Sequence, residues 1–445
     1  MATYVERPAG SPAPGSGWGT ATASLRHPQF RWMFASNISF FFAMNGQFIV
    51  RSILAYRLTD SAFSLGLVNL AIALPMLIIS PFGGVVADRV ERRRLILVAQ
   101  SALLATELVI FGLILTDRLA FWHLVAVVFL MGMIFPFNFP ARQAIVANIV
   151  GRDGLGNATA LNMGGMNAAR VAAPVLAGFL VTVVSIEGAY LFSIALYVVA
   201  LLAMARIHTS RPDPDARRNS VLRDMGDGFA YVWRDRPVRA LMALSLIPIL
   251  LAMPFQTLLV VFTTDVWHTG DAGLGAIQAA AGMGGIAGSV FVAWRGDSHR
   301  NVRLMMATLL AFAGTLFLFA ISPWFLLALP LVLISDVFAS IFGTVNSTTI
   351  NLIIPDAVRG RVMSLMMMTF GLTPLGTVPV SAAAEAWGAP VAVAGASVLT
   401  ALLAVLFFVL SPALRGVDQA HRGPDATEPQ SPRDRLTDVE PAAAG

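Results

Sequence analysis

Long apolar stretches fill most of the chain and alternate with short polar ones. A helix needs about 20 mainly apolar residues to cross a hydrocarbon core of about 30 Å. Backbone polar groups in lipid must be satisfied within their own segment. The pattern therefore predicts an all-α polytopic membrane protein with twelve transmembrane helices. The twelve stretches cover residues 31–56, 62–86, 93–116, 120–147, 158–184, 188–206, 239–263, 272–294, 302–321, 324–352, 362–385 and 389–414.

The basic residues predict how these helices are oriented. All of them are arginines, because the sequence contains no lysine. With the N-terminus inside, nearly all arginines fall in the tails or in inner loops. Arg57 and Arg118 fall outside, and Arg51 and Arg170 fall within spans. Positive loops stay on the cytoplasmic side, so we expect a multi-pass protein of the cell (inner or plasma) membrane with both termini cytoplasmic.

Composition agrees with a membrane protein and excludes several kinds of chemistry. The chain is 57% hydrophobic and 12% charged, whereas soluble domains are about 25% charged. The absence of cysteine excludes disulfides, thiolate metal sites and thiol nucleophiles, and the absence of lysine excludes a Walker-type phosphate loop. The arginines lie between apolar segments, which argues against nucleic acid as a partner. With no zinc-protease motif and no serine elbow, we expect no enzyme, metal or cofactor.

Polar stretches divide the chain into five parts. The second half repeats the first, since Arg31 aligns with Arg239 and Asn138 with Asn346 at one offset. Duplicated bundles are typical of secondary transporters, which bind substrate between the repeats. Within the linker, residues 221–234 are amphipathic and form either a surface helix or a tether. The parts are a disordered cytoplasmic tail (1–28), a six-helix bundle (29–206), a cytoplasmic linker (207–238), a second six-helix bundle (239–414) and a disordered cytoplasmic tail (415–445).

A charged motif lies between the second and third spans. Its residues are Gly84, Asp88, Arg89, Arg92 and Arg93. With the spacing Gly-x-x-x-Asp-Arg-x-x-Arg-Arg, the motif resembles the signature of the major facilitator superfamily. The resemblance implies a fold of two six-helix pseudo-repeats and a cytoplasmic latch made by these charges in the outward-facing state.

The match departs from the family pattern in two places. Glu91 stands where the family has a glycine, and the second-half copy around Asp297, Arg300 and Arg303 is degenerate.

Three further stretches narrow the resemblance to an exporter branch that includes enterobactin and macrolide efflux proteins. They are residues 138–144, 170–178 and 355–364, and the similarity extends over about 28–412. The second stretch is similar to the family's antiporter motif, with Ala173 in place of its first glycine. Its Pro174, Ala177 and Gly178 permit a kink and close helix packing.

The resemblance implies a monomeric, proton-coupled efflux pump for an amphipathic small molecule such as a drug, a macrolide or a siderophore. Such a pump works by alternating access. Two alternatives remain open at this stage. One is an importer or lysolipid flippase on the same fold, and the other is a membrane receptor or sensor that binds without translocating.

Four ionisable residues within the spans are candidates for a role in transport, because charges at membrane depth are costly and usually functional. Asp336 lies about 18 Å deep at 1.5 Å per residue, and it is the first candidate for a carboxylate that binds protons or a cation. Arg170 is also near mid-depth, where it can bind an anionic group or pair with Asp336. Glu107 is expected to pack inward against a neighbour, and Arg51 either reaches to the lipid headgroups or acts at the outer mouth. A purely structural role is open for each of them.

Uncharged polar groups and soft apolar side chains accompany these charges. Asn45, Gln47, Gln256 and Asn346 lie on cavity-type helices. They either orient the substrate or form hydrogen bonds between helices. Aromatic and methionine side chains suit promiscuous binding, although most such residues simply face lipid or pack. This set comprises Phe40, Phe41, Phe42, Phe48, Phe255, Met44, Met253 and Met366 to Met368.

Overall fold

The computed structural model describes residues 23–208, 221–295, 301–355 and 371–420, together with 358, 362, 365–366 and 368–369. These residues are helical almost throughout, and no strand occurs among them. Eleven helical segments are long and apolar enough to cross a membrane. The structure therefore confirms an all-α, polytopic architecture.

The first half begins with a short 3-10 turn and continues in five long helices. The last but one of these contains two candidate spans, Phe121–Val150 and Asn157–Val183, so the half provides six spans. The elements are η1 (Ala23–Arg26), α2 (Pro28–Thr59), α3 (Ala62–Arg89), α4 (Arg92–Leu115), α5 (Phe121–Val183) and α6 (Ile186–Ala205).

The long helix α5 turns back on itself between its two spans. Arg142 and Asn162 both contact the side chain of Asn37 on α2. A straight helix would separate residues twenty positions apart by about 30 Å. The chain therefore reverses direction between Arg142 and Asn162, as two antiparallel spans require.

The second half contains the remaining spans and two short helices at its ends. The eleventh predicted span, 362–385, corresponds in its second part to α14, which has 15 residues. With the eleven segments above, α14 agrees with the predicted twelve. The elements are α7 (Val221–Arg234), α8 (Arg236–Leu251), α9 (Phe255–Val261), η2 (Phe262–Val266), α10 (Gly270–Arg295), α11 (Asn301–Ala320), α12 (Phe325–Ile353), α14 (Thr373–Trp387), α15 (Ala389–Leu410) and α16 (Pro412–Ala420).

The seventh span is broken, although the apolar pattern predicted one continuous helix. Helix α8 ends at Leu251, and α9 begins only at Phe255. Pro254 lies at the break. A proline has no backbone N–H to donate and its ring clashes with the preceding turn, so it interrupts the helical ladder. The span then ends in the π-helical turn η2.

Both predicted tails are ordered where they join the bundles. Residues 412–420 form α16, where Leu414 and Val417 are buried and Ser411 accepts a hydrogen bond from the Leu414 N–H at 3.3 Å. At the other end, the backbone N–H of Ser24 in η1 donates to Asn157 at 3.0 Å. The prediction of disorder from 415 onward is therefore wrong for 415–420, because apolar residues anchor this turn. Residues 421–445 lie outside the described chain.

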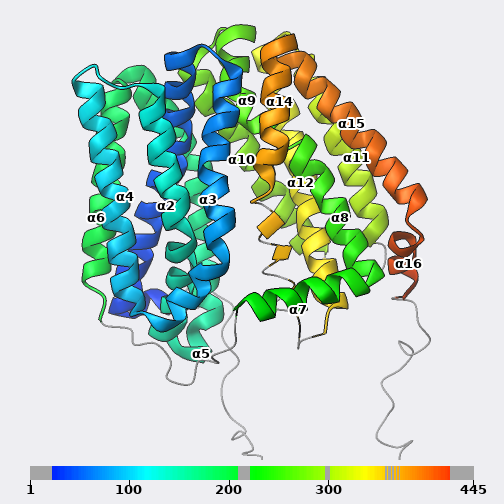
Figure 1. Ribbon diagram of the computed structural model, residues 1–445, viewed down its shortest axis with the longest axis horizontal. Helices are drawn as coiled ribbons and strands as arrows, with labels where there is room; N and C mark the ends of the chain where they lie inside the picture. Colours follow the sequence, from blue (N-terminus) through cyan, green and yellow to red (C-terminus); the bar gives the residue numbers. More distant parts are fainter. Residues whose placement is uncertain are drawn as a thin grey trace, which may run out of the picture.

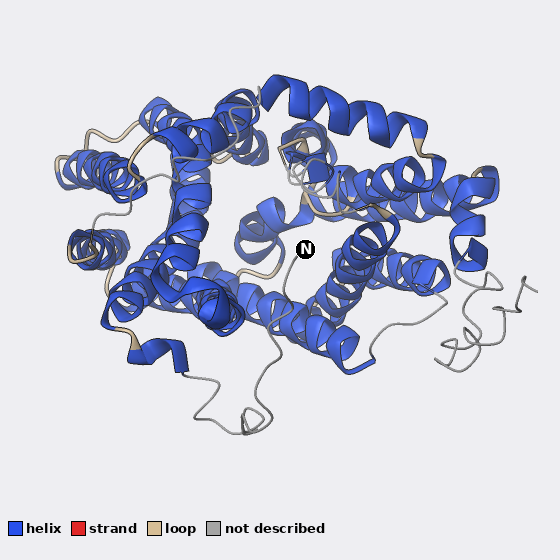
Figure 2. Cartoon of the chain, turned by 90° about the horizontal axis from the view of Figure 1, so that it is seen from below, coloured by secondary structure: helices blue, strands red, loops and turns tan. Residues whose placement is uncertain are grey.

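The two halves lie side by side, with α7 running across one end of the molecule (Figure 1). Figure 2, which looks along the bundles from below, shows many of the long helices nearly end-on. The amphipathic segment 221–234 is thus a helix. It is joined to α8 by Asp235, which accepts from the Val238 N–H at 3.0 Å and from the Tyr231 hydroxyl at 3.3 Å.

Candidate functional site

Polar contacts join the two halves at the end where α2 finishes and α3 begins. We call this the outer end, because the arginine pattern predicts that it faces outside. Tyr56 donates to Asp265 at 2.5 Å, and Arg57 pairs with Asp271. Glu385 accepts from the Ser61 hydroxyl at 3.1 Å and from the Phe63 N–H at 3.3 Å. Among residues whose side chains the structure describes, the polar contacts between the halves gather toward this end.

Glycines let the halves approach closely below these contacts. A Cβ on Gly178 of α5 would lie 2.8 Å from the Asp271 carbonyl oxygen and 2.9 Å from the Gly275 Cα of α10. A Cβ on Gly66 of α3 would lie 3.0 Å from the Cβ of Ser381 on α14. Real Cβ atoms rarely come this close, so only glycine fits at these crossings. Of the predicted packing residues, Gly178 faces α10, whereas Ala177 faces Gly46 of α2.

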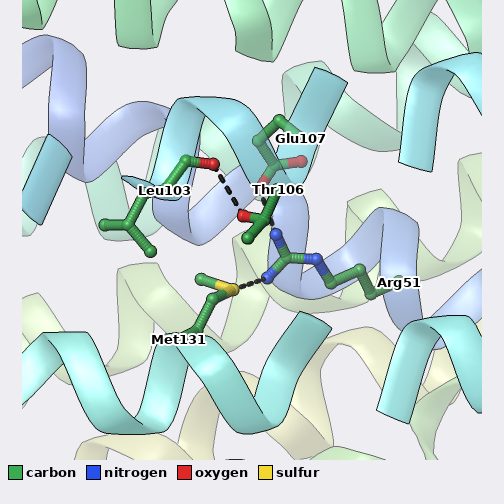
Figure 3. Close-up of polar contacts among 5 residues, drawn as sticks. All are labelled: Arg51, Leu103, Thr106, Glu107 and Met131. Atoms are coloured by element: carbon green, nitrogen blue, oxygen red, sulfur yellow. Dashed lines mark hydrogen bonds and ion pairs between the residues drawn. The ribbon is translucent and has the colours of Figure 1, made fainter. Parts of the chain in front are cut away.

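A buried ion pair lies inside the first half (Figure 3). Arg51 on α2 extends between α4 and α5, where one terminal nitrogen donates to Glu107 and the other to the Met131 sulfur at 2.7 Å. The side chains of Arg51 and Glu107 are only 7% and 0% exposed. The expectation that Arg51 reaches to the lipid headgroups is therefore wrong. Its charge is satisfied inward by Glu107, which itself packs inward as expected.

An apolar pocket of about 340 Å³ borders this ion pair. Its walls come from α2 to α6 and include Phe40, Met44, Phe48, Met131 and Tyr197. Two of the predicted soft aromatic side chains, Phe40 and Phe48, thus line a cavity. Arg51 and the polar candidate Asn45 also belong to the lining.

The carboxylate of Asp336 is buried in the second half, where α12 crosses α10. Asp336 is 6% exposed, and a Cβ on Gly284 of α10 would lie 3.1 Å from its Cβ. One oxygen, Oδ2, is buried with no hydrogen-bond partner among the described residues. Arg170 is exposed on α5, next to Val171, which packs against Gly282 of α10. No ion pair is found between Arg170 and Asp336 among the described residues.

The uncharged candidates lie in different surroundings. Gln47 is fully buried, and neither atom of its amide has a hydrogen-bond partner among the described residues. Asn346 is 2% exposed, with its side-chain oxygen likewise unpartnered there. Gln256 is partly exposed on α9. Asn45 donates to the Phe41 carbonyl at 2.8 Å, so its amide hydrogen bonds to its own helix.

Much of the predicted latch cannot be located. The side chains of Gly84, Asp88 and Arg89 lie outside the described part of the structure. Arg93 donates to the Ala205 carbonyl at 2.7 Å, which ties the start of α4 to the end of α6. Arg92 is partly buried at the first position of α4. The role of these residues as a latch stays a prediction.

One buried cation was missed because it was counted with the cytoplasmic arginines. Arg142 is 3% exposed inside the span Phe121–Val150. It donates to Asn138 at 2.8 Å and to Asn37, and its guanidinium lies 4.2 Å from the centre of the Phe40 ring. The signal was present in the sequence, since Arg142 falls within a predicted apolar stretch. Its position near the inner end of that stretch suggested a loop instead.

The sequence matches a family profile along most of its length. The profile describes a transmembrane secretion effector and matches residues 19–438. Among curated relatives, the staphyloferrin A transporter of Staphylococcus aureus is 22% identical over 80% of this chain and 89% of its own. The multidrug efflux pump Tap of Mycolicibacterium fortuitum is 25% identical over 81% and 90%. The enterobactin exporter EntS of Shigella boydii is 24% identical over 76% and 81%.

Solved structures share the fold at lower identity. A variant of the nucleoside transporter NupG matches with a TM-score of 0.72 at 13% identity, covering 86% of this chain and 99% of its own. A variant of the peptide transporter POT matches with a TM-score of 0.67 at 14% identity, covering 87% and 95%. Fold, motifs and family profile agree. The chain belongs to the transmembrane secretion effector family of the major facilitator superfamily, whose members are transporters.

Proposed function

We propose that the protein is a proton-coupled exporter of amphipathic small molecules that works by alternating access in the bacterial inner membrane. Both termini then lie in the cytoplasm. Relatives described as an enterobactin exporter and a multidrug efflux pump support the outward direction. The gathering of contacts at the outer end supports alternating access, because a transporter closed outside must open inside to load an exported substrate.

The observation that carries the coupling proposal is the environment of Asp336. Its carboxylate lies at mid-depth of α12, is almost fully buried, and leaves one oxygen without a partner among the described residues. Burial favours the neutral form of a carboxyl group, and a nearby cation favours the charged form. Arg170 is a cation on the other half, next to Val171, which packs against Gly282 of α10, two residues from the Gly284 that contacts Asp336. Movement of α5 against α10 and α12 would therefore load and unload a proton at Asp336.

The test is transport in inverted membrane vesicles with an acidic interior. We expect the wild type to accumulate enterobactin when the proton gradient is imposed. Asp336→Asn should abolish this accumulation and leave substrate binding measurable. Asp117→Asn is the matched control, because Asp117 lies in an exposed turn with φ 51° that asparagine tolerates. Proton-driven accumulation by Asp336→Asn at the wild-type rate would contradict the coupling role.

The sidedness of transport separates export from import on the same fold. An exporter fills inverted vesicles with an acidic interior, whereas an importer fills right-side-out vesicles with an acidic exterior; the periplasmic face is the acidic one in both cases. Saturable binding without accumulation in either orientation would indicate a receptor.

A further inference from the structure

The lining of the pocket in the first half indicates which charge a substrate should have. Its lining consists mainly of aromatic, methionine and aliphatic side chains, and the charged member of the described lining is Arg51. Glu107 does not reach the pocket, because it lies behind Arg51 and is 0% exposed. A ligand in this pocket therefore meets a positive charge on an otherwise apolar wall.

Arg51 has N–H donors that no strong acceptor occupies. A guanidinium carries five N–H donors, and Glu107 accepts from one terminal nitrogen. The other terminal nitrogen points at the Met131 sulfur, a weak acceptor. The Nε–H is buried and has no partner among the described residues. A charged donor left in this state gains from an oxygen acceptor, because charge-assisted hydrogen bonds are the strong ones.

The other polar groups of the pocket offer less. The Asn45 amide donates to the Phe41 carbonyl, and the Ser52 hydroxyl donates to the Phe48 carbonyl at 2.8 Å. Asn69 donates to the Leu65 carbonyl at 2.9 Å and, on the far side, to Thr257 of α9 at 3.4 Å. Asn69 thus places the rim of the pocket against the second half, where a transported molecule passes. Phe48, which also lines the pocket, is 44% exposed.

We propose that this pocket binds the aromatic, acid-bearing part of the substrate, with Arg51 as the residue that selects an anionic or strongly accepting oxygen group. This inference rests on the proposed transport function and names its substrate class. A volume of about 340 Å³ is at the lower end for small-molecule sites. It fits one ring system with its acidic group and not a whole macrolide. Cationic amphiphiles are disfavoured, since the charge they would meet is positive.

The test compares three ligands with one aromatic body and different charges. They are 2-naphthylacetate, its neutral amide and 2-(2-naphthyl)ethylammonium, each titrated calorimetrically into the purified full-length protein in lipid nanodiscs. The wild type should bind the acid at least tenfold more tightly than the ammonium, with the amide between them. Equal or tighter binding of the ammonium would overturn the proposal.

Variants test whether the preference for the acid arises at this pocket. Arg51→Met/Glu107→Leu removes both charges of the pair, and it should abolish the preference for the acid while retaining the amide. Glu107→Gln keeps Arg51 and should keep the preference. Retention of the acid preference by the double variant, or its loss in Arg170→Met instead, would overturn the assignment to this pocket.

Two further measurements keep the test decisive. If the double variant fails to fold, Val68→Trp fills the pocket from a partly exposed wall and should weaken both the acid and the amide. Unchanged binding of both would place the ligand elsewhere. Asp336→Asn should keep the acid preference while losing proton-driven transport. An acid preference without any transport by the wild type would leave the pocket assignment standing and contradict the proposed function.

Discussion

The ion pair of Arg51 and Glu107 illustrates what single residues contribute inside this membrane protein. The sequence placed both residues within spans, but it did not show that they face each other. Their pairing depends on how α2 and α4 are rotated about their axes, and spacing along one chain does not fix this rotation. The same limit applies to Arg142, because its partner Asn37 lies on a different span, whereas Asn138 lies one turn away on the same helix. Depth is predictable from sequence, whereas the partner is not.

We predict that breaking this pair destabilises the protein more than removing it does. Glu107→Gln leaves a buried guanidinium without its countercharge, a change that costs about 3–5 kcal/mol for buried pairs. Arg51→Met/Glu107→Leu replaces both charges by apolar groups and should recover most of this loss. Thermal unfolding of the detergent-solubilised protein measures both. Arg94→Gln, at an exposed position on α4, is the control and should change little. A double variant less stable than Glu107→Gln would contradict the prediction.

Helices from the two halves pack more closely against each other than their composition alone suggests. The small residues of 170–178 indicated close packing, and the structure places Gly178 against Gly275 of α10. The break in the seventh span was not predicted, although Pro254 within the apolar run is a residue type that interrupts helices. The helix α16 was not predicted, since its few apolar residues are followed by a polar stretch typical of a disordered tail. Short anchoring contacts of this kind appear only when the neighbouring helix α8 is in place.

We predict that Gly178→Ala weakens the crossing of α5 and α10. The new methyl group would meet backbone atoms at 2.8–2.9 Å, and backbone moves less readily than a side chain end. Overpacking of this type costs about 1–3 kcal/mol. Gly164→Ala on the same helix has nothing within 4 Å of its Cβ, so it should be neutral or stabilising, because alanine favours helix over glycine. Thermal unfolding of the two variants side by side tests this, and equal effects would contradict it.

At the scale of the whole molecule, the sequence predicted twelve spans, two halves and a membrane location, because apolar length and duplication are properties of the chain itself. It did not predict how the halves meet. Tyr56, Arg57 and Glu385 carry no signal of a contact between halves, since their partners lie more than 200 positions away. The outer-end contacts thus come from the structure alone.

We predict that weakening these contacts opens the outer end. Asp271→Asn/Glu385→Gln removes two carboxylate charges from these contacts, and an ion pair near the surface is worth up to about 1 kcal/mol. The chain has no cysteine, so Ser381→Cys, buried against Gly66 of α3, reports opening by its rate of maleimide labelling. We expect this labelling rate to rise severalfold in the protein that also carries Asp271→Asn/Glu385→Gln. Ser397→Cys, buried within α15 and away from the contact, should keep its rate. Equal labelling of Ser381→Cys in both backgrounds would show that the contacts do not hold the end closed.

The most direct test of proton-coupled alternating access is a pair of distances measured by double electron–electron resonance in nanodiscs. One spin-label pair, at Leu58 and Thr264, reports the outer end, and another, at Thr159 and Leu352, reports the inner end; all four positions are exposed. Between pH 8 and pH 5, the two distances should change in opposite directions in the wild type. Both should lose their pH dependence in Asp336→Asn. Distances that stay constant, change in the same direction, or respond to pH without the Asp336 carboxylate would contradict the account.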